Sequence, residues 1–234
     1  MSFLPSVLSC AAMTELEKCM ESLITIFHRY ANEAGDGKTL SKKEVGKLIE
    51  TELPNFLKSQ KDPKAVENIR KDLDQNKDSK MDFEEFMSLV VGLSMSCEKM
   101  FMLTSANSDE EYVVTHMGAR LSTTAMARLD QVITNIVDIF LEYAAEDGGK
   151  KPKLNKEELK KVLEQEIQSD ELKDKINPGD IEEAMAMLDK NHDGEVNFRE
   201  FCRCVSDLAK CYYQKKTGKG GKKGKGKEAE DEQD

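Results

Sequence analysis

The chain is poor in the residues that interrupt helices. Its 234 residues include only 14 glycines and 5 prolines, and they include no tryptophan. A chain with so few helix breakers and with 34% charged residues favours helices over strands. No run approaches the roughly eighteen uninterrupted apolar residues that a membrane-spanning helix needs, so no such helix is predicted.

Histidine and cysteine patterns that bind metals or catalyse reactions are missing. The three histidines lie far apart without an H-x-x-x-H pair, and the six cysteines form no C-x-x-C pair. Neither a zinc site nor a disulfide framework is therefore predicted. No nucleophile–base motif and no glycine-rich phosphate loop is recognisable. We expect reduced thiols in a protein that is not an enzyme.

Targeting signals are also weak. Residues 1–13 are apolar but lack a basic start, and the charged residues Glu15, Glu17 and Lys18 follow at once, which argues against a cleaved secretory signal. Ser2 occupies the position where N-myristoylation requires glycine. We expect a cytoplasmic protein.

Acidic residues outnumber basic ones by 45 to 35, which gives a net charge of -10. This balance makes nucleic acid an unexpected partner and is compatible with the binding of cations. Residues 215–234 alternate glycine with lysine and then turn acidic, so they are too polar to form a core and are predicted to be disordered. Contact of these lysines with acidic lipid or nucleic acid is an interpretation that the following acids weaken.

What the chain does contain is an internal repeat. An offset of 115 residues (189 − 74) superposes two D-x-N-x-D stretches, and an offset of 113 (143 − 30) superposes two segments upstream of them. The superposed pairs include Phe83 and Phe198, Glu85 and Glu200, Phe86 and Phe201, Leu16 and Leu129, Phe27 and Phe140, and Tyr30 and Tyr143. A repeat of this length indicates a duplicated domain. We expect domains at residues 1–103 and 122–214, a linker at 104–121 and a tail at 215–234.

Each copy has the apolar spacing of four helices. The upstream apolar residues recur at steps of 4, 3, 4 and 3, which is the spacing of one helix face. In the second copy the predicted helices lie near residues 123–144, 156–167, 179–188 and 198–214. In the first copy the fourth helix is predicted from Phe83 to about Leu103. The expected fold class is all-α, with four helices and two loops in each copy.

The loop before the fourth helix carries oxygen donors in both copies. An EF-hand loop of twelve residues binds Ca²⁺ through positions 1, 3, 5, 7, 9 and 12, of which position 7 uses its backbone carbonyl. In the first copy these positions hold Asp74, Asn76, Asp78, Lys80, Asp82 and Glu85. In the second copy they hold Asp189, Asn191, Asp193, Glu195, Asn197 and Glu200. The pattern predicts a calcium site in each loop.

The last donors of both loops have a second interpretation. Asp82-x-x-Glu85 and Asn197-x-x-Glu200 are also capping boxes, and a capping glutamate need not bind metal. That interpretation explains two donors of six in each loop, so calcium remains favoured. Ser79 stands where the second loop has Gly194, and a left-handed backbone at a residue other than glycine costs about 1–2 kcal/mol. The first loop has one acid more, so the order of the two affinities stays open.

The loop before the second helix is less distinctive. Residues 31–44 carry few acids at regular steps and end at Glu44. Read by spacing alone, the segment is better explained as a helix–helix connection that Ser41-x-x-Glu44 caps.

Taken together, these loops resemble those of the S-100 family, in which a fourteen-residue first loop precedes a standard twelve-residue loop. Residues 31–44 have that length, and TELEKCMESLITIFHRY before them is similar to the first helix of the family. The resemblance implies backbone carbonyl ligands and a bidentate glutamate at Ala31, Ala34, Asp36, Thr39 and Glu44. In the second copy Glu158 matches Glu44, but the loop is one residue longer and contains Pro152, so calcium binding there stays open.

The resemblance also implies a structure and a function for the whole chain. Family members are homodimers built through their first and fourth helices, so two fused copies imply an intramolecular pseudo-dimer that is monomeric in solution. Calcium would expose an apolar surface that binds target proteins, with annexins as plausible targets and with membrane contact only through them. The candidate surface comprises Phe56, Leu57, Val91, Met95, Met100, Phe101 and Met102. A calcium buffer that binds no target is the alternative.

Overall fold

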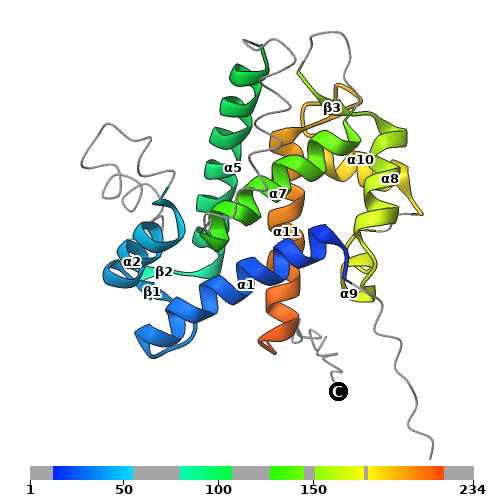
Figure 1. Ribbon diagram of the computed structural model, residues 1–234. Coiled ribbons are helices and arrows are strands. Elements are labelled where there is room, and N and C mark those ends of the chain that lie inside the picture. The colour runs from blue at the N-terminus through cyan, green and yellow to red at the C-terminus, as the bar shows by residue number, and fades with distance from the viewer. Residues whose placement is uncertain (1–12, 55–79, 107–126, 145–150, 177–178, 219–234) are drawn as a thin grey trace, which may run out of the picture.

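A computed structural model describes residues 13–54, 80–106, 127–144, 151–176 and 179–218 (Figure 1). The first copy contains α1 (Glu15–Ala34), β1 (Leu40–Ser41), α2 (Lys42–Glu52), β2 (Lys80–Met81) and α5 (Phe83–Ala106). The second copy contains α7 (Arg128–Tyr143), β3 (Lys153–Leu154), α8 (Lys156–Glu166), α9 (Asp170–Lys173), α10 (Ile181–Leu188), β4 (Val196–Asn197) and α11 (Phe198–Lys216). The predicted all-α class is confirmed.

Helix ends differ from the predicted ones by a few residues. The helix α5 continues to Ala106, three residues beyond the expected end, so the predicted linker begins with helical residues. The helix α11 continues to Lys216, and its last turn contains Lys215 and Lys216, whose charges interact favourably with the helix dipole. The short helix α9 was not predicted. The predicted third helix of the first copy, the rest of the linker and the end of the tail lie outside the described residues.

The two loops of each copy are joined by a short antiparallel sheet. Leu40 pairs with Met81 in the first copy, and Leu154 pairs with Val196 in the second. All four side chains are buried, so each sheet also closes one end of a core. This pairing holds the two loops of a copy at a fixed distance, as expected for paired EF-hands.

The same aromatic contact recurs in both cores, which supports the duplication. The ring of Phe27 lies 5.2 Å from that of Phe83 and 5.5 Å from that of Phe86. In the second copy the ring of Phe140 lies 5.1 Å and 5.4 Å from those of Phe198 and Phe201. Each cluster joins the first helix of its copy to the fourth.

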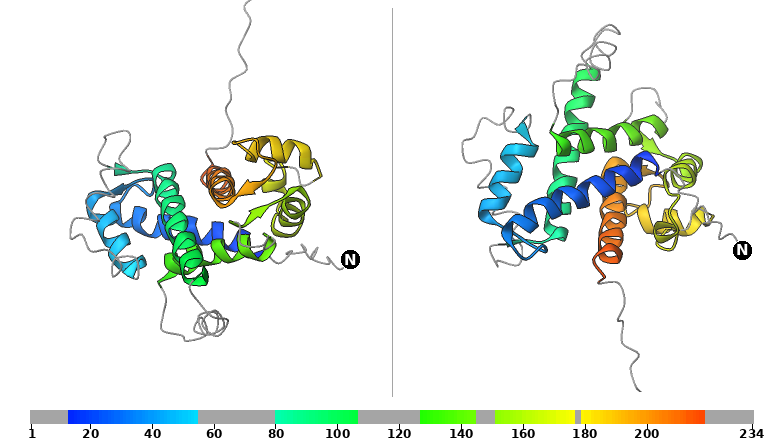
Figure 2. Two further views of the ribbon diagram at one scale, coloured as in Figure 1. Left: turned by 90° about the horizontal axis from the view of Figure 1, so that it is seen from above. Right: turned by 60° about the horizontal axis from the view of Figure 1, so that its bottom comes forward.

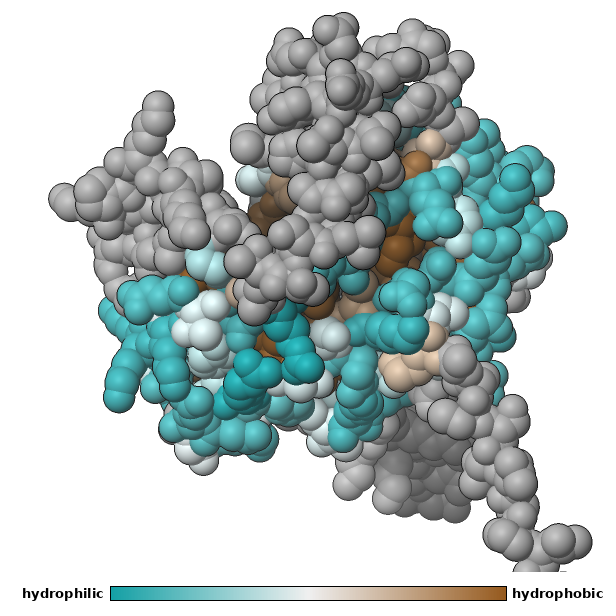
Figure 3. Space-filling view, in the orientation of Figure 1, coloured by the Kyte–Doolittle hydropathy of each residue, from teal (hydrophilic) through white to brown (hydrophobic). Residues whose placement is uncertain are grey.

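The two copies pack on each other through their first and fourth helices. The helix α1 packs along α7, and α5 packs along both α11 and α7 (Figures 1 and 2). Because α11 contacts both copies, ten of its residues are buried, including the free cysteines Cys202 and Cys204. Apolar side chains visible on the face in Figure 3 accordingly lie toward its middle, between hydrophilic margins. The two copies are therefore joined by these four helices, and the monomeric pseudo-dimer in solution stays a prediction.

Two glutamates connect the copies reciprocally. Glu52, at the end of α2, accepts a hydrogen bond from the backbone N–H of Leu129 in the other copy, at 3.3 Å. Glu166, at the end of α8, accepts one from the backbone N–H of Leu16, at 3.0 Å. Each carboxylate thus satisfies an N–H group in the first turn of the other copy's first helix, where a negative charge is favourable. We call these two contacts the reciprocal caps.

A tyrosine of the same copy orients each reciprocal cap. The hydroxyl of Tyr30 donates to Glu52 Oε1 at 3.1 Å, and that of Tyr143 donates to Glu166 Oε1 at 3.2 Å. Burial and the neighbouring carboxylate of Glu166 raise the pKa of Tyr143 to about 12, and burial and the carboxylate of Glu52 raise the pKa of Tyr30. Both hydroxyls therefore remain protonated donors over the physiological range.

Candidate calcium sites

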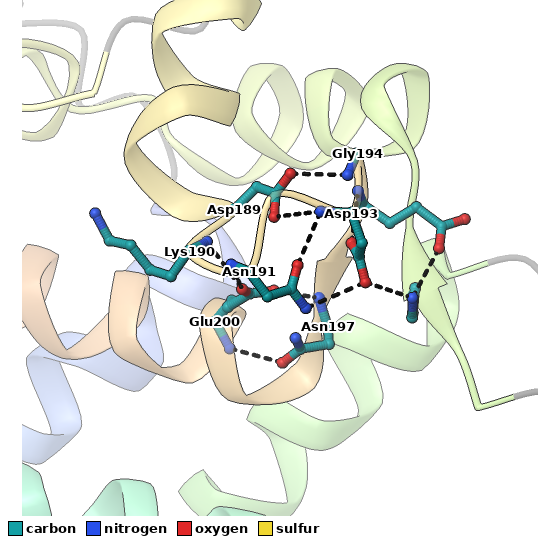
Figure 4. Close-up of polar contacts among 9 residues, drawn as sticks. Asp189, Lys190, Asn191, Asp193, Gly194, Asn197 and Glu200 are labelled. Atoms are coloured by element: carbon teal, nitrogen blue, oxygen red, sulfur yellow. Dashed lines mark hydrogen bonds and ion pairs between the residues drawn. The ribbon is translucent and has the colours of Figure 1, made fainter.

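The structure describes every residue of the loop that runs from Asp189 to Glu200 between α10 and α11 (Figure 4). Asp189 follows the last residue of α10 directly, and its side chain accepts hydrogen bonds from the backbone N–H groups of Asp193 at 3.2 Å and Gly194 at 2.8 Å. These bonds curl the loop around the Asp189 carboxylate, which is only 7% exposed. The first predicted ligand therefore lies inside the loop.

Two residues of this loop have a left-handed backbone. Gly194 has a φ of 84°, as the glycine at position 6 predicts. His192 has a φ of 58°, which the sequence did not indicate, although histidine adopts this region more readily than most residues. The two turns bring Asn191 and Asp193 together, with the amide nitrogen of Asn191 3.1 Å from Asp193 Oδ2.

Glu200 reaches both ends of the loop. Its Oε2 accepts a hydrogen bond from Asn197 N at 3.0 Å, and Asn197 Oδ1 accepts one from Glu200 N at 3.1 Å, so the capping box is present. Its Oε1 accepts from the backbone N–H groups of Lys190 at 2.9 Å and Asn191 at 3.3 Å. Those two bonds are additional to the two bonds of the capping box. They place the Glu200 carboxylate, 4% exposed, against the start of the loop.

A lysine that sequence reasoning missed also contacts this loop. Lys153 in β3 places Nζ 2.7 Å from Asp193 Oδ2 and 3.0 Å from Glu195 Oε2. The hydrogen bond from Lys153 lowers the pKa of Asp193, and the two carboxylates raise the pKa of Lys153. Its only signal in the sequence is its place just before Leu154, the residue that pairs with β4. The ammonium group of Lys153 thus partly neutralises the charge of the Asp193 carboxylate.

Half of the matching loop in the first copy is described. Asp74, Asn76 and Asp78 lie outside the described residues, whereas Lys80 forms part of β2. Asp82 and Glu85 form a capping box, with Asp82 N 3.2 Å from Glu85 Oε2 and Glu85 N 2.9 Å from Asp82 Oδ1. Glu85 is 6% exposed, much like its counterpart Glu200.

The fourteen-residue loop of the first copy begins inside α1. Ala31 and Ala34 belong to that helix, and the carbonyl of Ala31 accepts a hydrogen bond from Gly37 N at 3.2 Å. Two left-handed glycines, Gly35 and Gly37, turn the chain sharply after the helix. The predicted carbonyl donors of Ala31 and Ala34 therefore come from the last helical turn.

The second part of that loop is shaped by Asp36. Its side chain accepts hydrogen bonds from the Thr39 hydroxyl and from the backbone N–H groups of Lys38 and Thr39, and these bonds lower its pKa to about 2. Glu44 accepts from Ser41 N at 3.2 Å and from the Ser41 hydroxyl, so the predicted cap is present. Those bonds also lower the pKa of Glu44, which keeps the carboxylate charged.

The matching loop of the second copy is described only at its end. Residues 145–150 lie outside the described residues. Glu158 is half-buried, and its Oε2 accepts a hydrogen bond from Asn155 N at 2.9 Å. The sheet that follows forms as in the first copy, so the longer loop containing Pro152 still ends at the expected place.

The donor set of the Asp189 loop fits a hard cation. The side chains at its predicted ligand positions offer oxygen atoms, and the hydrogen bonds that Asp189 and Glu200 accept come from backbone N–H groups. Within the described ranges, no three histidine, cysteine, aspartate or glutamate side chains are already grouped around one point. The carboxylates would exchange those N–H groups for the ion. The assignment of individual ligands stays a prediction.

Both copies of this chain are similar to known calcium-binding proteins. Residues 16–60 and 129–169 match the model of the S-100/ICaBP type calcium binding domain, and residues 180–208 match that of the EF hand domain. Protein S100-A11 of Gallus gallus is 43% identical over 96 residues, which cover 41% of this chain and 95% of that protein. Protein S100-A11 of Homo sapiens is 46% identical over 89 residues, covering 38% of this chain and 85% of that protein.

Each of these relatives therefore spans less than half of the chain, whereas the family model matches it twice. The domains of both matched models bind Ca²⁺. No helix within the described residues is long and apolar enough to cross a membrane. The chain belongs to the S-100 family of calcium-binding proteins and carries two of its domains in tandem.

Proposed function

We propose that the protein is a cytoplasmic calcium sensor that docks on target proteins when calcium binds. The observation that supports this most is a groove of about 820 Å³ beside the Asp189 loop. Its apolar lining includes Val91, Ile176, Met187, Leu188, Leu208 and Cys211. Among the described residues, Met187 is the large hydrophobic side chain that is exposed, at 39%.

The groove is attached to both ends of the calcium loop. Met187 and Leu188 end α10, directly before Asp189, and Leu208 and Cys211 lie on α11, which begins just before Glu200. An ion that draws Asp189 and Glu200 together would move α10 relative to α11. Such a movement changes the width of the groove, which is how ion binding would control docking.

The surface that the sequence suggested in the first copy is described only in part. Val91 and Met95 are half-buried on α5, whereas Phe86, Leu89 and Leu93 are buried as expected of the core. Phe56 and Leu57, and the side chains of Met100, Phe101 and Met102, lie outside the described residues. Val91 lines the groove of the second copy instead.

Annexins are the targets that we propose, as the resemblance to the S-100 family implies, and calcium-dependent docking on them would bring this chain to membranes only indirectly. The competing proposal is a calcium buffer, which would bind ions without changing its surface.

A calcium titration with an apolar-surface dye and a parallel count of bound ions separates the two functions. The sensor predicts dye fluorescence that rises as the ions bind. Ions that bind without any dye response would favour the buffer, and a chain that binds no calcium would contradict both. Because the chain has no tryptophan, the dye signal is free of a tryptophan background.

A further inference from the structure

The groove of the second copy has a charge that differs from that of the whole chain. Four basic side chains line it, namely Lys175, Lys190, Arg203 and Lys210, against the acids Glu200 and Asp207. The chain as a whole has a net charge of -10. Glu200 is a predicted calcium ligand, so its charge would be matched by the ion. With calcium bound, the groove therefore has an excess of basic side chains, which we call the basic rim. We call its apolar lining the apolar floor.

Part of this basic rim is available to a partner. Lys210 is already paired, with Nζ 3.4 Å from Glu84 Oε1 and 3.6 Å from Asp207 Oδ1. Lys175, Lys190 and Arg203 are exposed, and none of them forms an ion pair with another described residue. These three side chains therefore offer positive charge at the edge of the groove.

The rim belongs to the second copy alone. The offset of 115 residues places Arg203 on Ser88 and Lys210 on Met95, and it places Lys190 on Gln75. Three cations of the second copy thus match neutral residues of the first. Ser88 and Val91 of α5 also line the groove, so the first copy supplies one wall and the second supplies the charge.

The shape of the groove fits a helix. Its lining follows α11 from Glu200 to Gln214, which corresponds to about 21 Å of helix at 1.5 Å per residue. A partner helix that lays one apolar face in such a groove turns its flanking side chains toward the rim. A basic rim stabilises acidic residues at those flanking positions and disfavours basic ones.

We propose that this groove takes an amphipathic helical segment of a partner protein whose flanking side chains are acidic, and that the charge preference belongs to the second copy. This inference rests on the proposed function, because it names the partner of the same docking site. The cations Lys175, Lys190 and Arg203 select the charge, and the apolar floor around Met187 supplies the affinity.

Two synthetic peptides test the proposal. Both carry leucine at i, i+3, i+4 and i+7, and one has glutamate and the other lysine at the flanking positions. Fluorescence anisotropy of labelled peptides is recorded with the full-length protein in saturating calcium and again in chelator. We expect the glutamate peptide to bind about tenfold more tightly in calcium, and we expect added salt to shrink that ratio because the rim is exposed.

A double variant locates the preference, and a matched variant controls for net charge. Lys175→Gln with Arg203→Ser removes two cations of the rim and reduces the ratio to below about threefold. Lys18→Gln with Lys47→Gln removes two exposed cations from α1 and α2, outside the groove lining, and leaves the ratio unchanged. Circular dichroism of each variant verifies its helix content.

The outcomes distinguish this inference from the proposed function. Equal binding of the two peptides in calcium would overturn the charge preference and leave the sensor in place. If the Lys175→Gln, Arg203→Ser variant kept the full preference for the glutamate peptide, the assignment of the charge preference to this rim would be wrong. If neither peptide bound in a calcium-dependent way, the proposed function would fall, and the inference with it.

Discussion

At the scale of single residues, two buried glutamates have the same place in the two copies. Glu85 and Glu200 each occupy the last predicted ligand position and the third residue of a helix, and each also completes a capping box. The same side chain can do both because its two oxygens divide the contacts. In the second copy, Oε2 bonds to the cap and Oε1 bonds to the start of the loop.

The first prediction concerns these glutamates. Glu85→Gln and Glu200→Gln should each abolish tight calcium binding at their own loop, because an amide replaces one carboxylate oxygen by a nitrogen that repels the ion. Calorimetric titration should show one bound ion fewer in each variant. Glu84→Gln, next to Glu85 but largely exposed, is the control and should keep the full stoichiometry. Unchanged stoichiometry in Glu85→Gln or Glu200→Gln would remove that residue from the ligand set.

A second prediction concerns Lys153, whose ammonium contacts Asp193 and Glu195. Lys153 competes with calcium for the Asp193 carboxylate, so Lys153→Met should raise the affinity of that loop. The side chains are about one-third exposed, which limits the gain to about twofold to fivefold. Lys160→Met on α8 removes the same charge from a more exposed site and should change the affinity less. A weaker affinity in Lys153→Met would show that Lys153 supports the loop instead.

At the scale of elements, the second and first helices of opposite copies are joined by the reciprocal caps. Glu52 is 3% exposed and accepts hydrogen bonds from the Arg29 guanidinium, the Tyr30 hydroxyl and the Leu129 backbone N–H. Its removal leaves these three donors without their acceptor. The fourth helices are less symmetric. Tyr213 on α11 stacks on Phe83 of the other copy at 4.1 Å, whereas the matching position on α5 is Glu98. The stack of Tyr213 on Phe83 is thus a contact between the copies that α5 does not reciprocate.

The third prediction tests the reciprocal caps by stability. Glu52→Ala should lower the free energy of unfolding by about 1–3 kcal/mol, because it leaves buried donors unsatisfied. Glu50→Ala on the exposed face of the same helix is the matched control and should cost less than about 0.5 kcal/mol. Urea unfolding followed by circular dichroism measures both. Equal midpoints for the two variants would mean that the cap contributes nothing to the interface.

At the scale of the whole molecule, the interface that other family members are expected to form between two chains is formed here within one. The helices α1, α5, α7 and α11 contribute to it, and we expect that no second chain binds there. The acidic net charge of -10 further opposes self-association.

The fourth prediction concerns the oligomeric state and follows from this interface within one chain. The protein should be monomeric with and without calcium, and light scattering should give a mass near 26.4 kDa at all concentrations tested. A mass twice as large, or one that rises with concentration, would show that a further surface mediates association. Ile133 on α7 is only 5% exposed. Ile133→Glu should therefore destabilise the fold and should not change the oligomeric state of the folded protein.

The sequence by itself determined the helical class, the duplication and the two standard calcium loops, because these features are local. The spacing of the oxygen donors in Asp189–Glu200, and the steps of 4 and 3 between apolar residues of a helix face, can each be read from one continuous segment of the chain. The end of α2 at Glu52 also has a local cause, since Pro54 follows two residues later.

The tertiary structure alone decided how the copies meet and which side chains share a site. Lys153 is forty residues from Asp193, and Glu52 is 77 residues from Leu129, so no local pattern relates them. Their contacts arise because the short β3–β4 sheet and the packing of α2 against α7 bring distant segments of the chain together. The basic rim of the groove, with its wall from the other copy, likewise exists only once distant segments pack together.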